Sequence, residues 1–271
     1  MSDLAMSDLA TTDLAATFAG KVVLVTGSSS GAGVSIACEF ARHGARVAVH
    51  CRSSIEAAMA VVGRISAAGG VARAFNADLA QSSVPDSLVS AVESRLGPVS
   101  ILVNNAGPFA DAPYRTLASS TWDQIMAVNL KAPYLLAQRV VPGMEKLGWG
   151  RIVNVGATSG FVRTHSVYGL AKAALLHLTQ SLALELAPTI TVNAVVPSQI
   201  ASARTDSMPV YKNAAIAGTP LGRLVTEDEI GRMVVLACSP AFDFVTGQTI
   251  VMDGGRTWPR FPRIGLADGE A

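Results

Sequence analysis

The sequence predicts an α/β fold whose centre is a parallel β-sheet covered by helices on both faces. Short runs rich in β-branched residues recur along the chain and are apolar at almost every position, as is typical of strands buried on both sides. Longer stretches with helical periodicity separate these runs, so each strand is expected to lead into a helix that crosses back over the sheet. Right-handed crossovers of this kind give a doubly wound parallel sheet of the Rossmann type, here in a single domain.

Strands and helices alternate regularly from residue 21 onward. We expect strands at residues 22–26, 46–51, 71–76, 101–104, 152–155, 191–196 and 249–252. We expect helices at residues 33–43, 55–68, 84–96, 121–147, 168–186 and 227–238. No change in composition marks a second domain, and 271 residues are within the usual size of one large α/β domain.

Three segments lie outside this alternation. Residues 1–20 repeat a five-residue unit that begins as MSDLA, and we expect a flexible extension before a domain that spans residues 21–255. Residues 256–271 are rich in proline and arginine and are expected to form an extended C-terminal arm. The long stretch 197–221 appears irregular in pattern, and we interpret its residues 198–220 as a lid over the substrate.

The composition excludes several classes of protein. Half of the residues are apolar and 15% are charged, which is the opposite of a disordered chain. The 21 basic and 20 acidic residues leave a net charge of +1, so nucleic acid is not an expected partner. No membrane span, secretory signal or metal-binding cluster is apparent, and the three cysteines have no pairing pattern. We therefore expect a cytoplasmic protein with reduced thiols, no membrane partner and no metal.

A glycine-rich turn follows the first predicted strand and precedes the first predicted helix. In the segment TGSSSGAG, Gly27 permits a tight turn, Gly31 lets backbone amides approach a pyrophosphate, and Gly33 lets the helix pack closely on the sheet. The amino end of that helix offers free N–H groups and the positive end of its dipole. The pattern predicts a dinucleotide cofactor bound by Gly27, Ser29, Ser30, Gly31 and Ala32.

The end of the second predicted strand distinguishes between the two nicotinamide dinucleotides. An NAD site usually has an acidic side chain there for the ribose hydroxyls, whereas this chain has Cys51 followed by Arg52 and Ser53. No carboxylate repels a 2′-phosphate at this position, and Arg52 is able to form charge-assisted hydrogen bonds to one. We therefore favour NADP over NAD. The alternative is that Arg52 is a solvated loop residue and both cofactors are accepted.

Tyr168 and Lys172 form the clearest catalytic pattern. Their spacing of four residues places both side chains on one face of a helix. A phenol titrates too high to act as a base at neutral pH unaided, and a neighbouring ammonium is expected to lower its pKa. Such a pair serves as the acid and base that transfers the proton of an alcohol. A surface pair without function is the alternative.

Together these motifs resemble those of the short-chain dehydrogenase/reductase family, from about residue 21 to residue 255. The matching segments are TGSSSGAG at 26–33, Asp78-Leu79, NNAG at 104–107, Asn129 in VNL, YGLAK at 168–172, TVNAVVP at 191–197 and VTGQTIVMDGG at 245–255. The resemblance implies an NAD(P)-dependent oxidoreductase that interconverts a ketone or aldehyde and an alcohol by hydride transfer.

The resemblance also implies roles for individual residues. Tyr168 would be the catalytic acid/base, Lys172 would lower its pKa and bind the nicotinamide ribose, and Asn129 would hold a water in the proton relay. The further cofactor contacts that the family implies are Asp78, Leu79, Asn105, Ala106, Gly107, Pro197, Ser198, Ile200 and Ser202. Where the family usually has PGxxxT, this chain has Ser198 in place of the glycine and Ser202 in place of the threonine.

One departure concerns the serine that the family places before the catalytic tyrosine to bind the reacting oxygen. The matching position holds Ala157, and the connection to Tyr168 is shorter than in the family. We favour Thr158 as the substitute donor and Ser159 next, and the third interpretation is that no donor remains. Two other functions stay open on the same fold: a nucleotide-binding sensor or scaffold, and an epimerase or dehydratase that uses a transient hydride step.

The substrate and the assembly are less clearly indicated. The pocket is expected to contain Phe109, Phe161, Val162, Met208 and Tyr211, with Arg163, His165 and Arg204 at a cationic rim. Such a pocket would suit a moderate-sized ketone, including one with an acid group, unless the three cations are solvated. An acyl group on a carrier protein is the alternative, although no dedicated basic patch is apparent. The long helices at 121–147 and 168–186 are apolar on more than one face, and in similar proteins such helices pair, which predicts a homotetramer or homodimer.

Overall fold

Seven parallel strands form the central sheet in the computed structural model, which describes residues 14–162 and 166–258. The strands are β1 Val22–Val25, β2 Arg46–Cys51, β3 Val71–Asn76, β4 Val99–Asn104, β5 Gly150–Val155, β6 Ile190–Pro197 and β9 Thr249–Met252. They lie in the order β3-β2-β1-β4-β5-β6-β9, which confirms the predicted fold class. The order reverses between β1 and β4, and doubly wound sheets bind their ligands at such a reversal.

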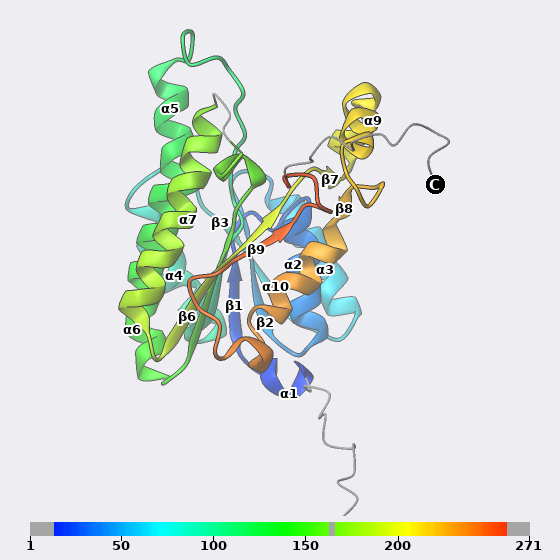
Figure 1. Ribbon diagram of the computed structural model, residues 1–271. Helices are drawn as coiled ribbons and strands as arrows, with labels where there is room; N and C mark the ends of the chain where they lie inside the picture. Colours follow the sequence, from blue (N-terminus) through cyan, green and yellow to red (C-terminus); the bar gives the residue numbers. More distant parts are fainter. Residues whose placement is uncertain (1–13, 163–165, 259–271) are drawn as a thin grey trace, which may run out of the picture.

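Helices cover both faces of the sheet (Figure 1). One face carries α2 Ala32–Arg42, α3 Ile55–Ala67 and α10 Glu227–Leu236, and the other carries α4 Val84–Leu96, α6 Ala132–Lys146 and α7 Val167–Leu186. Successive residues of a strand point to opposite faces, so β1 contributes Val23 and Val25 to one apolar cluster and its other two residues to the second. All four are buried, and each such side chain stabilises the fold by about 1.5–3 kcal/mol.

The helix predicted at residues 121–147 contains a π-helical turn. α5 (Ser119–Met126) continues into this turn, η1 (Ala127–Lys131), and then directly into α6. Asn129 lies in the turn, where its side-chain Nδ2 donates a hydrogen bond to the carbonyl oxygen of Ile125 at 3.0 Å. Hydrophobic periodicity does not reveal such turns, which are frequent at functional sites.

The stretch 197–221 is more regular than its sequence suggests. It contains β7 Ile200–Ala201, α8 Ala203–Asp206 and α9 Pro209–Ala217, and β7 pairs with β8 Val225–Thr226 in a second sheet. Both helices are too short to show clear periodicity, and local signals begin them instead. Ser202 caps α8 by accepting a hydrogen bond from the amide of Thr205, and Pro209 occupies the first turn of α9. Figure 1 shows α9 beside β7 and β8, away from the main sheet.

The domain begins before residue 21. The short helix α1 (Leu14–Phe18) lies within the predicted extension, and Phe18 is fully buried with its ring edge-on to that of Phe40 at 5.4 Å. The repeated pattern of residues 1–20 hid this anchor, although its last unit, ATFAG, matches the unit before it, TTDLA, at only one position. The flexibility predicted for residues 1–13 falls outside the described residues.

The start of the predicted C-terminal arm packs on the domain as a turn. Arg256 Nη1 donates a hydrogen bond to the carbonyl oxygen of Ala215 in α9 at 2.6 Å, and the amide of Thr257 donates to Asp253 at 2.8 Å. Residues 259–271 lie outside the described part of the chain. Two 3-10 turns complete the fold, η2 (Thr158–Gly160) and η3 (Pro240–Phe242). Within residues 14–162 and 166–258, no helix is long and apolar enough to cross a membrane.

Candidate active site

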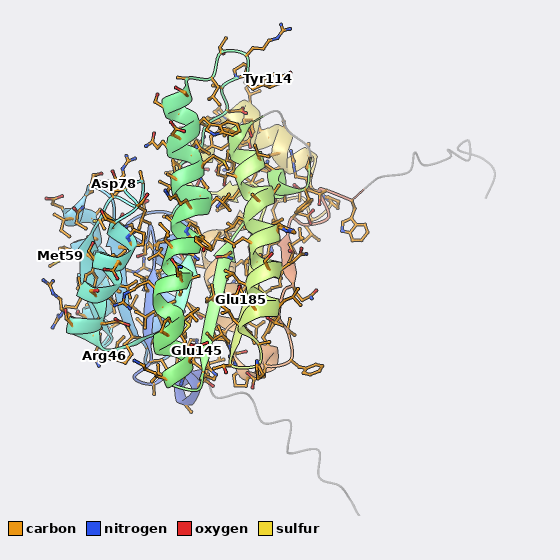
Figure 2. All side chains as sticks on the ribbon, turned by 90° about the vertical axis from the view of Figure 1, so that its left-hand side faces the viewer. Arg46, Met59, Asp78, Tyr114, Glu145 and Glu185 are labelled. Carbon is orange, nitrogen blue, oxygen red and sulfur yellow. The ribbon has the colours of Figure 1, made fainter. Side chains whose placement is uncertain are left out.

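A cleft of about 860 Å³ opens at the carboxyl ends of the strands, beside the reversal between β1 and β4. Figure 2 shows this polarity: Arg46, which begins β2, lies near one end of the molecule, and Asp78, which follows β3, lies toward the other. Because parallel strands end at the same edge, residues distant in the sequence meet there.

Every residue predicted to contact the cofactor lines this cleft. These residues are Gly27, Ser29, Ser30, Gly31, Ala32, Arg52, Ser53, Asp78, Leu79, Asn105, Ala106, Gly107, Tyr168, Lys172, Pro197, Ser198, Ile200 and Ser202. They form one continuous surface from the glycine turn to Tyr168. The two other predicted site residues, Asn129 and Thr158, are not part of that lining.

The glycine turn has the geometry that its sequence predicts. Gly27 adopts a left-handed φ of +63°, and a Cβ added there would lie 2.9 Å from the Cα of Ala106. A Cβ on Gly33 would lie 2.4 Å from the carbonyl oxygen of Gly27, so α2 begins in direct contact with the turn. Gly31 precedes α2 without a side chain to cap it, which leaves the first amides of the helix available for an anion.

The end of β2 has no carboxylate toward the cleft. The thiol of Cys51 is buried, and its Sγ accepts a hydrogen bond from Nδ2 of Asn76 at 3.6 Å. The same Nδ2 donates to the carbonyl oxygen of Arg52 at 2.9 Å, which fixes the backbone as it leaves the strand. Arg52 and Ser53 are exposed and line the cleft. A guanidinium and a hydroxyl fit a 2′-phosphate.

The structure adds His50 to the site, a residue that the sequence reasoning missed. His50 Nδ1 accepts a hydrogen bond from the amide of Gly27 at 3.0 Å, and Nε2 donates to the carbonyl oxygen of Ala77 at 3.0 Å. Burial lowers the pKa of His50, so the ring is neutral and holds the glycine turn against the ends of β2 and β3. The signal was a single polar residue inside the apolar run VAVHC.

Tyr168 and Lys172 lie together, as predicted, but their pKa values differ from the prediction. Lys172 is buried, with its Nζ 2.8 Å from the carbonyl oxygen of Val155, to which it donates, and 5.6 Å from the Tyr168 ring. Burial lowers the pKa of Lys172 to about 8 and raises the pKa of Tyr168 to about 12. The cation that lowers the pKa of Tyr168 is Arg204 rather than Lys172, and burial outweighs it.

Asn129 lies behind Lys172. Its Nδ2 donates to the carbonyl oxygens of Pro108 and Ile125, and its Oδ1 is buried without a hydrogen-bond partner among the described residues. A Cβ on Gly107 would lie 2.4 Å from this Oδ1 and 3.3 Å from Lys172 Nζ, so the two groups face the same point of the backbone. The free acceptor and the ammonium are suitably placed for a proton relay, and the relay itself stays a prediction.

The position of the missing serine is occupied by Ala157, which lines the cleft beside Tyr168. Thr158 and Ser159 belong to the 3-10 turn η2 and are not among the lining residues, so the structure does not place the preferred substitute, Thr158, where a donor is needed. The reason is that the tight turn beginning at Thr158 packs directly on α7. Gly160 approaches the helix so closely that an added Cβ would lie 3.1 Å from the carbonyl carbon of Lys172.

Among the residues expected at the substrate pocket, Arg204 lines the cleft and Phe109 lies between Arg204 and Tyr168. The ring centroids of Phe109 and Tyr168 are 5.2 Å apart, and the guanidinium carbon of Arg204 is 4.8 Å from the centroid of Phe109. The apolar candidates are all exposed and are not among the residues that line the cleft: Phe109, Phe161, Val162, Met208 and Tyr211. The predicted cations Arg163 and His165 fall outside the described residues.

Comparison with known proteins gives consistent matches over most of the chain. A family model described as Enoyl-(Acyl carrier protein) reductase matches residues 27–257. The chain is 36% identical over 239 residues to the 3-oxoacyl-(acyl-carrier-protein) reductase FabG of Staphylococcus aureus, covering 87% of this chain and 97% of that protein.

Two solved structures have the same architecture. A short-chain type dehydrogenase/reductase from Mycobacterium marinum is 31% identical with a TM-score of 0.83, and the match covers 89% of this chain and 97% of that one. A gluconate 5-dehydrogenase from Burkholderia cenocepacia, solved in complex with NADP and tartrate, is 28% identical with a TM-score of 0.83, covering 90% and 97%.

Proposed function

Because this chain belongs to the short-chain dehydrogenase/reductase family, we propose that it is an NADP(H)-preferring oxidoreductase that interconverts a ketone or aldehyde and an alcohol. The observation that carries the proposal is one cleft with two different ends. The glycine turn and Arg52 lie at one end, and Tyr168 with Lys172 at the other. This separation suits a long dinucleotide whose reactive part must meet a proton donor.

The lining residues fit a nicotinamide dinucleotide. The exposed amides at the start of α2 suit a pyrophosphate, and Arg52 suits a 2′-phosphate. Asp78 and Leu79 would flank the adenine, and the segment from Pro197 to Ser202 would border the nicotinamide. When bound, the cofactor supplies or accepts the hydride.

The protein's part in the reaction is to position the carbonyl and to move one proton. Because its pKa lies at about 12, Tyr168 is protonated at neutral pH and is ready to donate to a carbonyl oxygen, which favours the reductive direction. Lys172 and the free Oδ1 of Asn129 lie behind it and would return the proton from solvent. Because Ala157 has no hydroxyl, the carbonyl oxygen of the substrate lacks the second hydrogen-bond donor that the family's serine supplies. Such a loss lowers the rate by about 10²–10³.

The test is NADPH consumption with a panel of ketones and aldehydes by the native protein and by Tyr168→Phe. We expect the substitution to reduce kcat by about 10²–10⁴, because no other group replaces the phenol proton. Tyr114→Phe is the matched control, since Tyr114 is exposed and lies outside the cleft lining. Near-normal turnover by Tyr168→Phe contradicts the assignment.

A second candidate, a nucleotide-binding sensor, is favoured by Ala157 alone. Under that hypothesis the protein binds NADPH tightly and reduces none of the ketones and aldehydes in the panel. The intact arrangement of Asn129, Tyr168 and Lys172 supports the enzyme instead. Calorimetric NADPH titration beside the turnover assay distinguishes the two.

We also propose that the protein forms a homotetramer or homodimer through α5, α6 and α7. Trp122, Tyr134, Leu170 and Leu184 are large apolar or aromatic side chains left exposed on these helices. A second copy of the same helices would cover them. Sedimentation as a monomer at micromolar concentration would contradict this assembly.

A further inference from the structure

A cationic side chain lies at the reaction end of the cleft, and no acid in the described part of the chain pairs with it. Arg204 lines the cleft beside Tyr168, and its guanidinium lies over the face of Phe109 at 4.8 Å. Phe109 in turn meets the ring of Tyr168 at 5.2 Å, at a steep interplanar angle of 69°. One aromatic ring therefore separates the charged group from the predicted proton donor.

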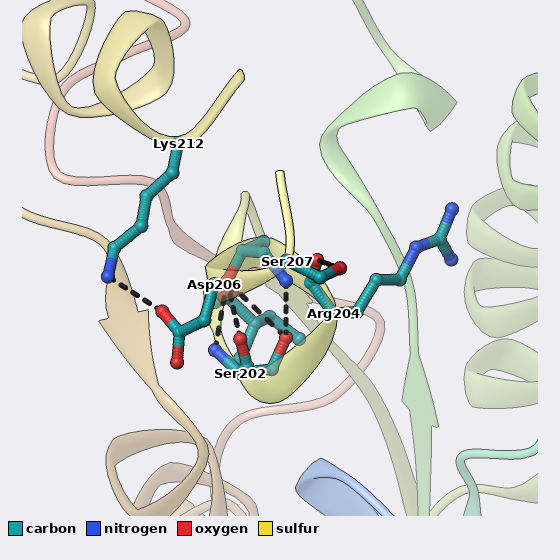
Figure 3. Close-up of polar contacts among 7 residues, drawn as sticks. Ser202, Arg204, Asp206, Ser207 and Lys212 are labelled. Carbon is teal, nitrogen blue, oxygen red and sulfur yellow. Dashed lines mark hydrogen bonds and ion pairs between the residues drawn. The ribbon is translucent and has the colours of Figure 1, made fainter. Parts of the chain in front are cut away.

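The charge of Arg204 is not neutralised within the described residues. The neighbouring acid, Asp206, is engaged by Lys212, whose Nζ lies 2.7 Å from Oδ1. Figure 3 shows the Arg204 side chain extending away from that pair. In residues 14–162 and 166–258, no ion pair is formed by Arg204.

Arg204 also differs from the other cations that line the cleft. Lys172 is buried and donates to the carbonyl oxygen of Val155, and Arg52 lies at the end of β2, on the cofactor side. The acids of the lining, Asp78 and Glu227, follow β3 and begin α10. The end that contains Tyr168 and Ala157 thus has one exposed cation and no acid among the described lining residues.

A guanidinium is suited to a planar anion, because its N–H groups match the two oxygens of a carboxylate. The face of Phe109 supports the guanidinium plane, so less freedom is lost when both hydrogen bonds form. A single guanidinium balances a single negative charge, which favours a carboxylate over a phosphate ester. The charge of Arg204 also reaches the phenol, since it lowers the pKa of Tyr168 against the effect of burial.

From this geometry, and resting on the proposed oxidoreductase function, we propose that Arg204 is a specificity-determining residue that binds the carboxylate of an oxo acid or hydroxy acid. The carboxylate pairs with Arg204 while the carbonyl of the same molecule reaches Tyr168 past the ring of Phe109. In reduction, the carbonyl carbon gains the hydride from the cofactor and its oxygen gains the proton from Tyr168. The carboxylate is unchanged.

Binding is tested separately from turnover on the full-length protein saturated with NADP⁺, which has no hydride to give. The probes are 3-oxobutanoate, 4-oxopentanoate and 5-oxohexanoate, each beside its uncharged methyl ester, in isothermal titration calorimetry. We expect at least one acid to bind about 10- to 100-fold more tightly than its ester, and Arg204→Met to remove that difference. Arg204→Lys keeps the charge but not the paired N–H groups, so this variant should retain only part of the preference for the acid over the ester.

Arg232→Met is the matched control. It removes one exposed arginine from α10, outside the cleft lining, and so changes the net charge equally. This variant should keep the preference for the acid. In NADPH-linked assays, Arg204→Met should raise KM for the acid and leave kcat and the KM for the ester nearly unchanged.

Three outcomes would overturn the proposal. Equal binding of acid and ester by the native protein means that no carboxylate is recognised. A fall in NADP⁺ affinity in Arg204→Met, with the acid preference intact, assigns Arg204 to the cofactor. An equal fall of kcat for acid and ester, with a shifted pH profile, assigns it to the ionisation of Tyr168.

Failure of the underlying function gives a different result. A carboxylate preference that depends on Arg204, with no turnover of any carbonyl, rejects the oxidoreductase and keeps the binding site. Turnover of esters without an acid preference rejects the role of Arg204 alone.

Discussion

The two ends of the cleft are built from different parts of the chain. The cofactor end is mainly backbone: the tight turn at Gly27, the close approach of α2 at Gly33 and the amide hydrogen bond to His50. The reaction end consists mainly of side chains from several separate segments, including Tyr168 and Arg204. Backbone shape follows from a short glycine pattern, whereas side-chain chemistry can change with each substitution. The fold therefore preserves the first end and leaves the second free to vary.

Lys172→Met tests the reaction end with the largest expected effect. We expect turnover to fall by about 10²–10⁴, because the proton relay loses its cation. We expect the free energy of unfolding at pH 7 to increase by about 1–3 kcal/mol, because the pKa of Lys172 falls from 10.5 to about 8 on burial and folding therefore disfavours the charge. Turnover assays and urea unfolding measure both. A variant that is both inactive and less stable contradicts the second expectation.

The same variant gives a pH dependence of definite sign. The unfolded chain keeps the Lys172 proton up to its ordinary pKa of 10.5, whereas the folded chain loses it at about 8. The native protein should therefore gain stability as the pH rises from about 8 toward 10.5, and the advantage of Lys172→Met should shrink over that interval. The control Lys131→Met changes an exposed lysine of η1 and keeps Lys172, so its stability should rise over this interval as that of the native protein does.

Arg52→Gln tests the cofactor end at the guanidinium that lines it. We expect kcat/KM for NADPH to fall by about 10- to 100-fold while the value for NADH stays constant, because only the 2′-phosphate needs the guanidinium. The control is Arg73→Gln, an exposed arginine on β3 outside the cleft. Equal losses for both cofactors would show that Arg52 does not discriminate between them.

Gly33→Ala tests whether backbone contact defines the cofactor end. The added Cβ would meet the carbonyl oxygen of Gly27 at 2.4 Å, so we expect a loss of about 1–3 kcal/mol in the free energy of unfolding and weaker NADPH binding. The matched control is Gly63→Ala inside α3, where no atom lies within 4 Å of the new Cβ. That change should stabilise the protein by about 0.5–1 kcal/mol. Thermal unfolding of both variants, read in parallel, measures the difference.

The smallest effects concern the missing serine. Thr158→Val should leave kcat unchanged within about two-fold, because Thr158 does not reach the cleft lining. Ala157→Ser should increase kcat by about 10-fold, because a hydroxyl there would face the reacting oxygen. A large loss in Thr158→Val would show that η2 rearranges and that Thr158 is the donor after all.

The sequence was sufficient for the sheet, its covering helices and the glycine turn, because each depends on a local pattern. It was insufficient where distant segments meet. The position of Thr158 depends on how a shortened loop packs on α7, and the pKa of Tyr168 depends on burial and on Arg204 from another segment. The anchor at Phe18 was missed for the same reason, since it depends on contact with Phe40.

The short sheet formed by β7 and β8 has a consequence for how substrate range could change in evolution or by design. Ile200 pairs with Val225, and Ala201 with Thr226, so residues 202–224 leave and re-enter the domain at one point. Thr226 caps α10, and Ser202 caps α8, so each boundary also fixes a helix. Residues 203–224, which include Arg204, could therefore be exchanged for the matching segment of a relative while the predicted cofactor contacts up to Ser202 stay the same.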